Sequence, residues 1–88
     1  MATEELDYVE RAVAETASKA SWPQLPVMRS EVYDRIDIDC WGRLTDVQMA
    51  LLADVIDARF KREGKLWDVW TDSQRGKVHV AERERETE

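Results

Sequence analysis

The sequence predicts an α+β protein with the element order α-β-α-β-β. Three patterns carry this prediction: a capped apolar segment over residues 45–63, a period-two segment over residues 33–41, and a hairpin pattern over residues 66–82. We expect a small three-stranded antiparallel sheet that helix 45–63 covers on one face, with a first helix alongside. The runner-up is a winged-helix arrangement, in which residues 28–36 are helical.

The first helix is expected over about residues 4–20, because apolar side chains recur there at helical spacing. They are Leu6, Val9, Val13, Ala17 and Ala20. Pro23 and Pro26 then break the helix, since each proline pushes the residue before it towards an extended conformation. We expect Trp22 and Leu25 to anchor this connector.

Residues 33–41 favour a strand, although Ser30 can instead start a short helix that reaches Arg35. The strand prediction depends on alternation, because apolar side chains at every second position are typical of a half-buried strand. Ile36, Ile38 and Cys40 alternate with Asp37, Asp39 and Trp41.

The helix over residues 45–63 has local signals at both ends. Thr45 and Gln48 have the spacing of a capping box, and Gly64 is placed to stop the helix. Its apolar residues form two stripes. The first stripe comprises Met49, Leu52, Ala53, Ile56 and Phe60; the second stripe comprises Val47, Leu51, Val55 and Ala58. One stripe is usual for a surface helix, so this helix is either central in the fold or contacts a partner.

The last elements are expected to be strands over residues 66–71 and 77–82, with Gly76 in a left-handed conformation in the loop between them. Trp67 and Trp70 point to opposite faces of the first of these strands, so one is expected in the core and the other at least partly exposed. We expect one globular domain over residues 1–80, followed by a charged, frayed tail over residues 81–88.

Composition limits the classes of function. The 88 residues carry a net charge of −6, and 36% of them are charged, which disfavours general attraction to nucleic acid or to an anionic membrane. The single cysteine rules out an internal disulfide, and no signal peptide or membrane-spanning run is visible. A cytoplasmic protein is the simplest interpretation.

Candidate catalytic groups are few. Asp37 and Asp39 project from the same face of a strand and can hold Mg²⁺ there, but the polar face of an amphipathic strand explains them better. A dyad of Cys40 with His79, the only histidine, would need their strands to be neighbours, and the apolar pattern around Cys40 favours a buried, inert thiol. We therefore expect no enzyme, no metal and no cofactor.

The second stripe and an exposed tryptophan are typical of a protein-interaction surface, because binding energy concentrates at aromatic anchors within apolar patches. The predicted binding residues are Val47, Leu51, Val55, Trp67 and Trp70. We expect a non-catalytic, small acidic module that binds a protein partner or forms a homodimer. A phage-type accessory or inhibitor protein would fit the size, acidity and composition. The alternative is that both stripes pack within the chain.

DNA binding is the competing hypothesis. Helix 45–63 and hairpin 66–82 resemble the last elements of a winged-helix domain, and basic residues near them imply a patch for phosphates. These residues are Arg59, Arg62, Lys65, Arg75 and Lys77. The resemblance covers residues 45–80 only, and Asp46, Asp54 and Asp57 on its would-be recognition helix would repel phosphates.

Overall fold

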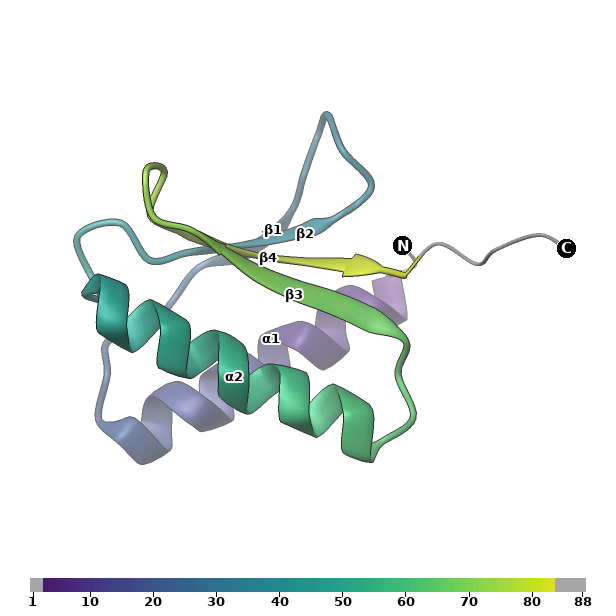
Figure 1. Cartoon of the computed structure of the whole chain (residues 1–88), viewed down its shortest axis with the longest axis horizontal. Helices are drawn as coiled ribbons and strands as arrows, with labels where there is room; N and C mark the ends of the chain where they lie inside the picture. The colour runs from purple at the N-terminus through teal and green to yellow at the C-terminus, as the bar shows by residue number, and fades with distance from the viewer. Residues whose placement is uncertain (1–2, 84–88) are drawn as a thin grey trace, which may run out of the picture.

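A computed structural model describes residues 3–83 of the chain. In these residues, two helices pack on a four-stranded antiparallel sheet, so the predicted α+β class is confirmed. The elements are α1 (Thr3–Ala20), β1 (Val27–Arg29), β2 (Ile36–Asp39), α2 (Asp46–Arg62), β3 (Trp67–Asp72) and β4 (Lys77–Glu82). Both helices lie on one side of the sheet, with α2 beneath β3 and α1 behind α2 (Figure 1).

The ends of α2 are the ones that the sequence predicts. The Thr45 hydroxyl accepts the Gln48 N–H at 3.2 Å, and the Gln48 side-chain oxygen accepts the Thr45 N–H at 2.8 Å. At the other end, Gly64 has φ +75, and the Lys65 N–H donates to the Phe60 carbonyl at 2.8 Å. Together with the Gly64 N–H, which donates to the Lys61 carbonyl, this forms a Schellman motif.

Helix α1 buries a narrow face rich in small residues. Val9, Ala12, Val13 and Ala17 are buried, and this face packs against α2 and β1. The connector after α1 is anchored as predicted, because Leu25 is buried and Trp22 packs partly buried against the same core.

The number and order of strands differ from the prediction. The sheet has four strands in the order β1-β2-β4-β3, and the element order is α-β-β-α-β-β. The strand expected over residues 33–41 is shorter, because β2 covers only Ile36–Asp39. Before it lies β1, which pairs with β2 through Val27↔Ile38, Met28↔Asp37 and Arg29↔Ile36.

The winged-helix alternative is wrong, because residues 28–36 form no helix. The chain turns between β1 and β2, and the Ser30 hydroxyl accepts the N–H groups of Val32 and Tyr33 at 3.2 and 3.0 Å. Ser, with its short hydroxyl side chain, stabilises turns in this way by competing with helical hydrogen bonds. The serine considered as a helix start is therefore the start of a turn.

The predicted hairpin is present, with its strands displaced by one residue or less. β3 pairs with β4 from Trp67↔Glu82 to Asp72↔Lys77, and Gly76 has φ +63 in the loop between them. Ala81 and Glu82, which the domain prediction places in the tail, belong to β4. Residues 84–88 of that tail lie outside the described residues.

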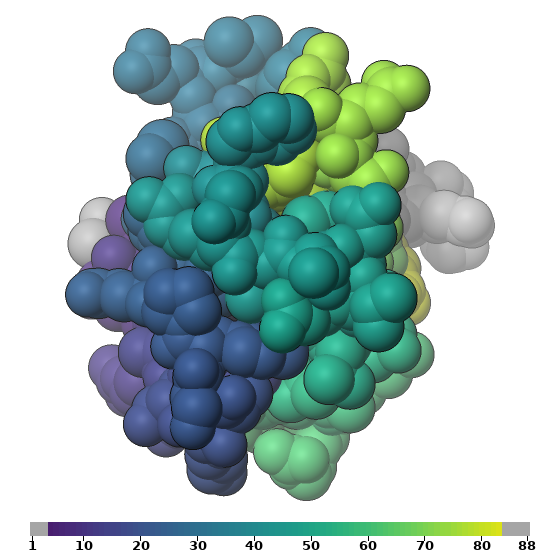
Figure 2. All heavy atoms as spheres, turned by 90° about the vertical axis from the view of Figure 1, so that its left-hand side faces the viewer, coloured from purple at the N-terminus to yellow at the C-terminus, as the bar shows by residue number. Residues whose placement is uncertain are grey.

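The core fills the space between the sheet and the two helices. It draws on α1, the connector, α2 and the inner faces of the strands, with Ile36, Ile38, Val78 and Val80 fully buried. At the end of the molecule shown in Figure 2, the segment 41–45 lies against the hairpin 73–76. Neither α1 nor α2 covers the other face of the sheet, which we call the open face (Figure 1).

Candidate functional site

The second stripe of α2 is exposed. The whole first stripe is buried, whereas Val47 is 79% exposed, Leu51 52% and Val55 43%, and Ala58 is exposed as well. At 100° per residue, the second stripe is centred on the side of the helix opposite the first, and it therefore faces away from the core. The alternative that both stripes pack within the chain does not hold for the described residues.

Trp67 and Trp70 lie on opposite faces of β3, as the pleat of a strand requires. Trp67 is 7% exposed and makes edge contacts with the rings of Phe60 (4.8 Å between centroids) and Tyr8 (5.5 Å). Trp70 is 40% exposed and lies on the open face. The second stripe and Trp70 are therefore on opposite sides of the molecule, and they do not form the single binding surface that the sequence predicts.

A polar cluster that the sequence analysis missed crosses the open face. The registers align Met28, Asp37, His79 and Trp70 in one row across all four strands. His79 is 1% exposed; its Nδ1 lies 2.8 Å from an Asp37 carboxylate oxygen, and its Nε2 lies 3.4 Å from one of Asp72. The Trp70 ring lies 5.4 Å from the imidazole.

The charges of this cluster are compensated locally. Burial alone would raise the pKa of the Asp72 carboxyl, but its contacts with His79 and Arg75 outweigh burial and hold that pKa below its usual value. Asp37 also accepts a hydrogen bond from Arg35 at 3.0 Å. Alternation along each strand predicts which residues share this face. Which of them are neighbours across strands depends on the register of the sheet.

Both carboxylates proposed as catalytic candidates, Asp37 and Asp39, make hydrogen bonds within the chain. Asp39 accepts from the Trp41 N–H at 3.1 Å, and Asp37 is held by Arg35 and His79. No group of three His, Cys, Asp or Glu side chains in the described part of the chain is arranged to hold a metal ion.

Cys40 and His79 also lie apart. Cys40 is fully buried in the core, on the other side of the sheet from His79. Burial, with the nearby Asp39 charge, raises the pKa of the Cys40 thiol to about 11, so the thiolate needed of a nucleophile is disfavoured.

The basic residues proposed for DNA binding fall into two groups. Arg59, Arg62 and Lys65 are at the end of α2, whereas Arg75 and Lys77 are at the hairpin, and Figure 1 places these segments at opposite ends of the molecule. Two members of the first group are already engaged: Arg59 pairs with Glu15 and Glu63, and the Lys65 ammonium lies over aromatic rings.

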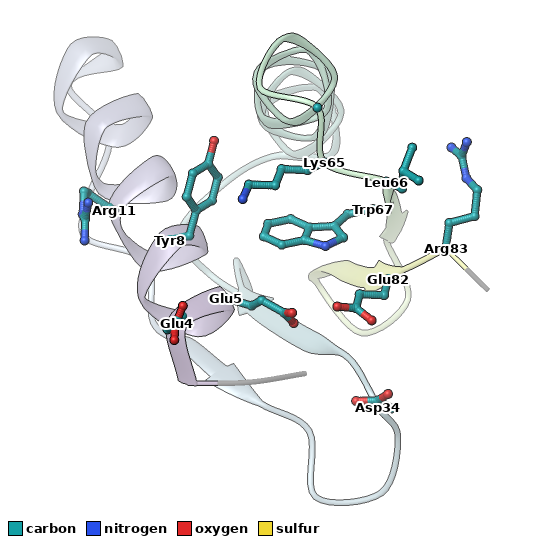
Figure 3. Close-up of a pocket in the computed structure, with 11 residues that line it drawn as sticks. Glu4, Glu5, Tyr8, Arg11, Asp34, Lys65, Leu66, Trp67, Glu82 and Arg83 are labelled. Carbon is teal, nitrogen blue, oxygen red and sulfur yellow. The ribbon is translucent and has the colours of Figure 1, made fainter. Parts of the chain in front are cut away.

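A pocket of about 1030 Å³ lies where the start of α1, the end of α2 and the end of β4 meet. Figure 3 shows Tyr8 and Lys65 beside the indole of Trp67, with carboxylates around them. The Lys65 Nζ is 5.1 Å from the Tyr8 ring centroid and 5.4 Å from that of Trp67. The chain's own ammonium group therefore already occupies the aromatic wall that a cationic ligand would use.

Comparison of the chain with protein-family models, with curated proteins and with solved structures finds no match. Within residues 3–83, neither helix is long and apolar enough to cross a membrane.

Proposed function

We propose that this chain is a non-catalytic interaction module that docks a protein partner, or a second copy of itself, through the second stripe of α2. One observation carries the proposal: Val47, Leu51 and Val55 are between 43% and 79% exposed on one face of a helix whose other face forms the core. Helices presenting apolar side chains at i, i+4 and i+8 are a common way of filling a hydrophobic groove.

The energy available from this stripe sets the expected strength of binding. Fully burying a Val or Leu side chain contributes about 1.5–3 kcal/mol, so completing the burial of these three contributes about 3–5 kcal/mol. Association itself costs about 4–15 kcal/mol in lost freedom. The stripe is therefore an anchor, and a stable complex also requires contacts with the charged residues on either side of it.

A cytoplasmic location and a phage-type role are part of the same proposal. A cytoplasmic location is supported by the absence of an internal disulfide in a chain with one cysteine. The small size and net charge of −6 support a phage-type accessory or inhibitor role.

The test compares the oligomeric state and partner capture of three variants. Leu51→Asp and Val55→Asp place a charge in the stripe, while Ala50→Asp places the same charge at an exposed position on the flank of the same helix. We expect the first two to abolish dimerisation in sedimentation analysis, or retention of a host partner, and Ala50→Asp to preserve it. Circular dichroism checks that all three remain folded. A folded monomer that retains no partner, or a complex indifferent to Leu51→Asp, contradicts the proposal.

DNA binding has less support, because its five basic residues fall into two separate groups and α2 carries Asp46, Asp54 and Asp57. Retardation of duplex DNA at low salt, lost on combining Arg75→Glu with Lys77→Glu, would favour it instead.

A further inference from the structure

Among residues 3–83, no strand pairs with the outer side of β3, which is therefore a long sheet edge. The strand order β1-β2-β4-β3 makes β1 and β3 the two edges, and β3 has six residues where β1 has three. Figure 1 shows β3 at the front of the sheet, with α2 below it and no other strand beyond it. An edge of this length presents unpaired backbone groups to which another chain can pair.

The alternation of hydrogen-bonded pairs between β3 and β4 shows which backbone groups of β3 point outward. The Arg83 N–H donates to the Leu66 carbonyl at 2.7 Å, immediately before the first β3–β4 pair, Trp67↔Glu82. Because hydrogen-bonded pairs alternate along an antiparallel ladder, Asp68, Trp70 and Asp72 point their backbone groups towards β4. The N–H and C=O groups of Trp67, Val69 and Thr71 therefore point outward from the sheet.

The side chains along this edge define the chemistry of an occupant. Asp68, Trp70 and Asp72 lie in that order on the open face, and Asp68 is 51% exposed at its side chain. A strand added to this edge would place its own alternate side chains directly opposite these three, at the close, non-hydrogen-bonded positions. Cations opposite the two carboxylates and an apolar residue opposite the indole would complement them.

We propose that the β3 edge docks an extended segment of a partner protein with the alternating pattern basic–apolar–basic, which adds to the sheet as a fifth, antiparallel strand. Asp68 already contacts Arg83 at 3.0 Å and Asp72 contacts Arg75 at 3.3 Å. Asp72 also lies 3.4 Å from His79. Each carboxylate has about four acceptor sites, so it accepts a further donor without releasing those it already has.

A second copy of the chain is a poorer occupant of this edge. A two-fold axis at Trp70 would pair the Asp68 of each copy with the Asp72 of the other. Like charges directly opposite each other in a sheet are destabilising. An axis at Val69 would leave each Asp68 opposite an indole with no cation. Any register shifted by one residue would set the core-facing side of one strand against the open face of the other.

This edge is separate from the second stripe, so the inference holds or fails independently of the proposed function. The probe is a seven-residue capped peptide with lysine at its second and sixth positions, valine at its fourth and threonine elsewhere. It is titrated into the ¹⁵N-labelled full chain. We expect the largest amide shifts at Trp67, Val69 and Thr71, and about tenfold weaker binding of the same peptide with glutamate in place of lysine.

Two variants test the backbone and the charge separately. Thr71→Pro removes one outward N–H at an exposed edge position without breaking a β3–β4 hydrogen bond, whereas Thr71→Val keeps that N–H. We expect binding of the lysine peptide to weaken about five- to tenfold in Thr71→Pro relative to Thr71→Val. Asp68→Lys should abolish the preference between the two peptides, because each peptide then faces one like charge and one opposite charge.

Several outcomes overturn the inference. They are shifts confined to residues outside β3, equal binding of the lysine and glutamate peptides, equal binding by the two Thr71 variants, and no shift along β3 at millimolar peptide. A symmetric dimer through β3 in the unliganded chain overturns it as well, because the edge would then be occupied by a second copy.

Discussion

Gly76 is the position where the structure makes its sharpest prediction about stability. It has φ +63, and a Cβ built on it would lie 2.7 Å from Cε3 and 2.9 Å from Cα of Trp41. Gly64 has a similar φ of +75 but nothing within 4 Å of its would-be Cβ. The two glycines therefore share the cost of a left-handed backbone and differ in steric contact alone.

The expected magnitudes follow from this difference. A left-handed conformation costs a residue with a Cβ about 1–2 kcal/mol, so Gly64→Ala should lower the free energy of unfolding by about that amount. Forcing an extra methyl group into occupied space costs about 1–3 kcal/mol more. Gly76→Ala should therefore lower it by about 2–5 kcal/mol, because the Trp41 backbone cannot move aside as a side-chain end can.

The assay is urea unfolding followed by circular dichroism for the two variants and the unmodified chain. For a domain of this size, each kcal/mol corresponds to about 4–8 °C in Tm, so thermal unfolding gives an independent measure. Equal destabilisation by Gly76→Ala and Gly64→Ala would refute the close approach of Trp41 to the hairpin.

Two further predictions concern ionisable groups. The Arg59 guanidinium holds the pKa of Glu15 below its usual 4.5, and the Tyr8 hydroxyl does the same for Glu63. The stability these carboxylates contribute is fully present above pH 4.5 and is lost as pH falls through their lowered pKa values, so the urea midpoint should drop below pH 4.5. Combining Glu15→Gln with Glu63→Gln should lessen that drop, and an unchanged drop would contradict the assignment. Cys40 is fully buried and the pKa of its thiol is raised to about 11, so a thiol reagent should modify it only as fast as the chain unfolds, and rapid modification under native conditions would refute its burial.

Helix α2 shows what local sequence can predict. The capping box of Thr45 and Gln48 and the glycine stop at Gly64 each act within one helical turn, so neighbouring residues suffice to place the ends. The helical projection likewise separated its two apolar stripes, because the angle between residues depends only on helical geometry.

The sheet shows where such reasoning stops. β1 is three residues long and follows two prolines, so it has no periodic pattern of its own and exists because it pairs with β2. The hydrogen bonds that the Ser30 hydroxyl accepts stabilise a turn there, and residue propensities do not separate this turn from a helix over residues 28–36.

The candidate surfaces were likewise predictable only in part from the sequence. The sequence by itself determined that α2 has two apolar stripes and that Trp67 and Trp70 face opposite ways, since these follow from fixed local periods. Only the tertiary structure decided which stripe is exposed, which tryptophan is buried, and that His79 lies between Asp37 and Asp72. These depend on strand order and register, which are set by contacts between residues far apart in the chain.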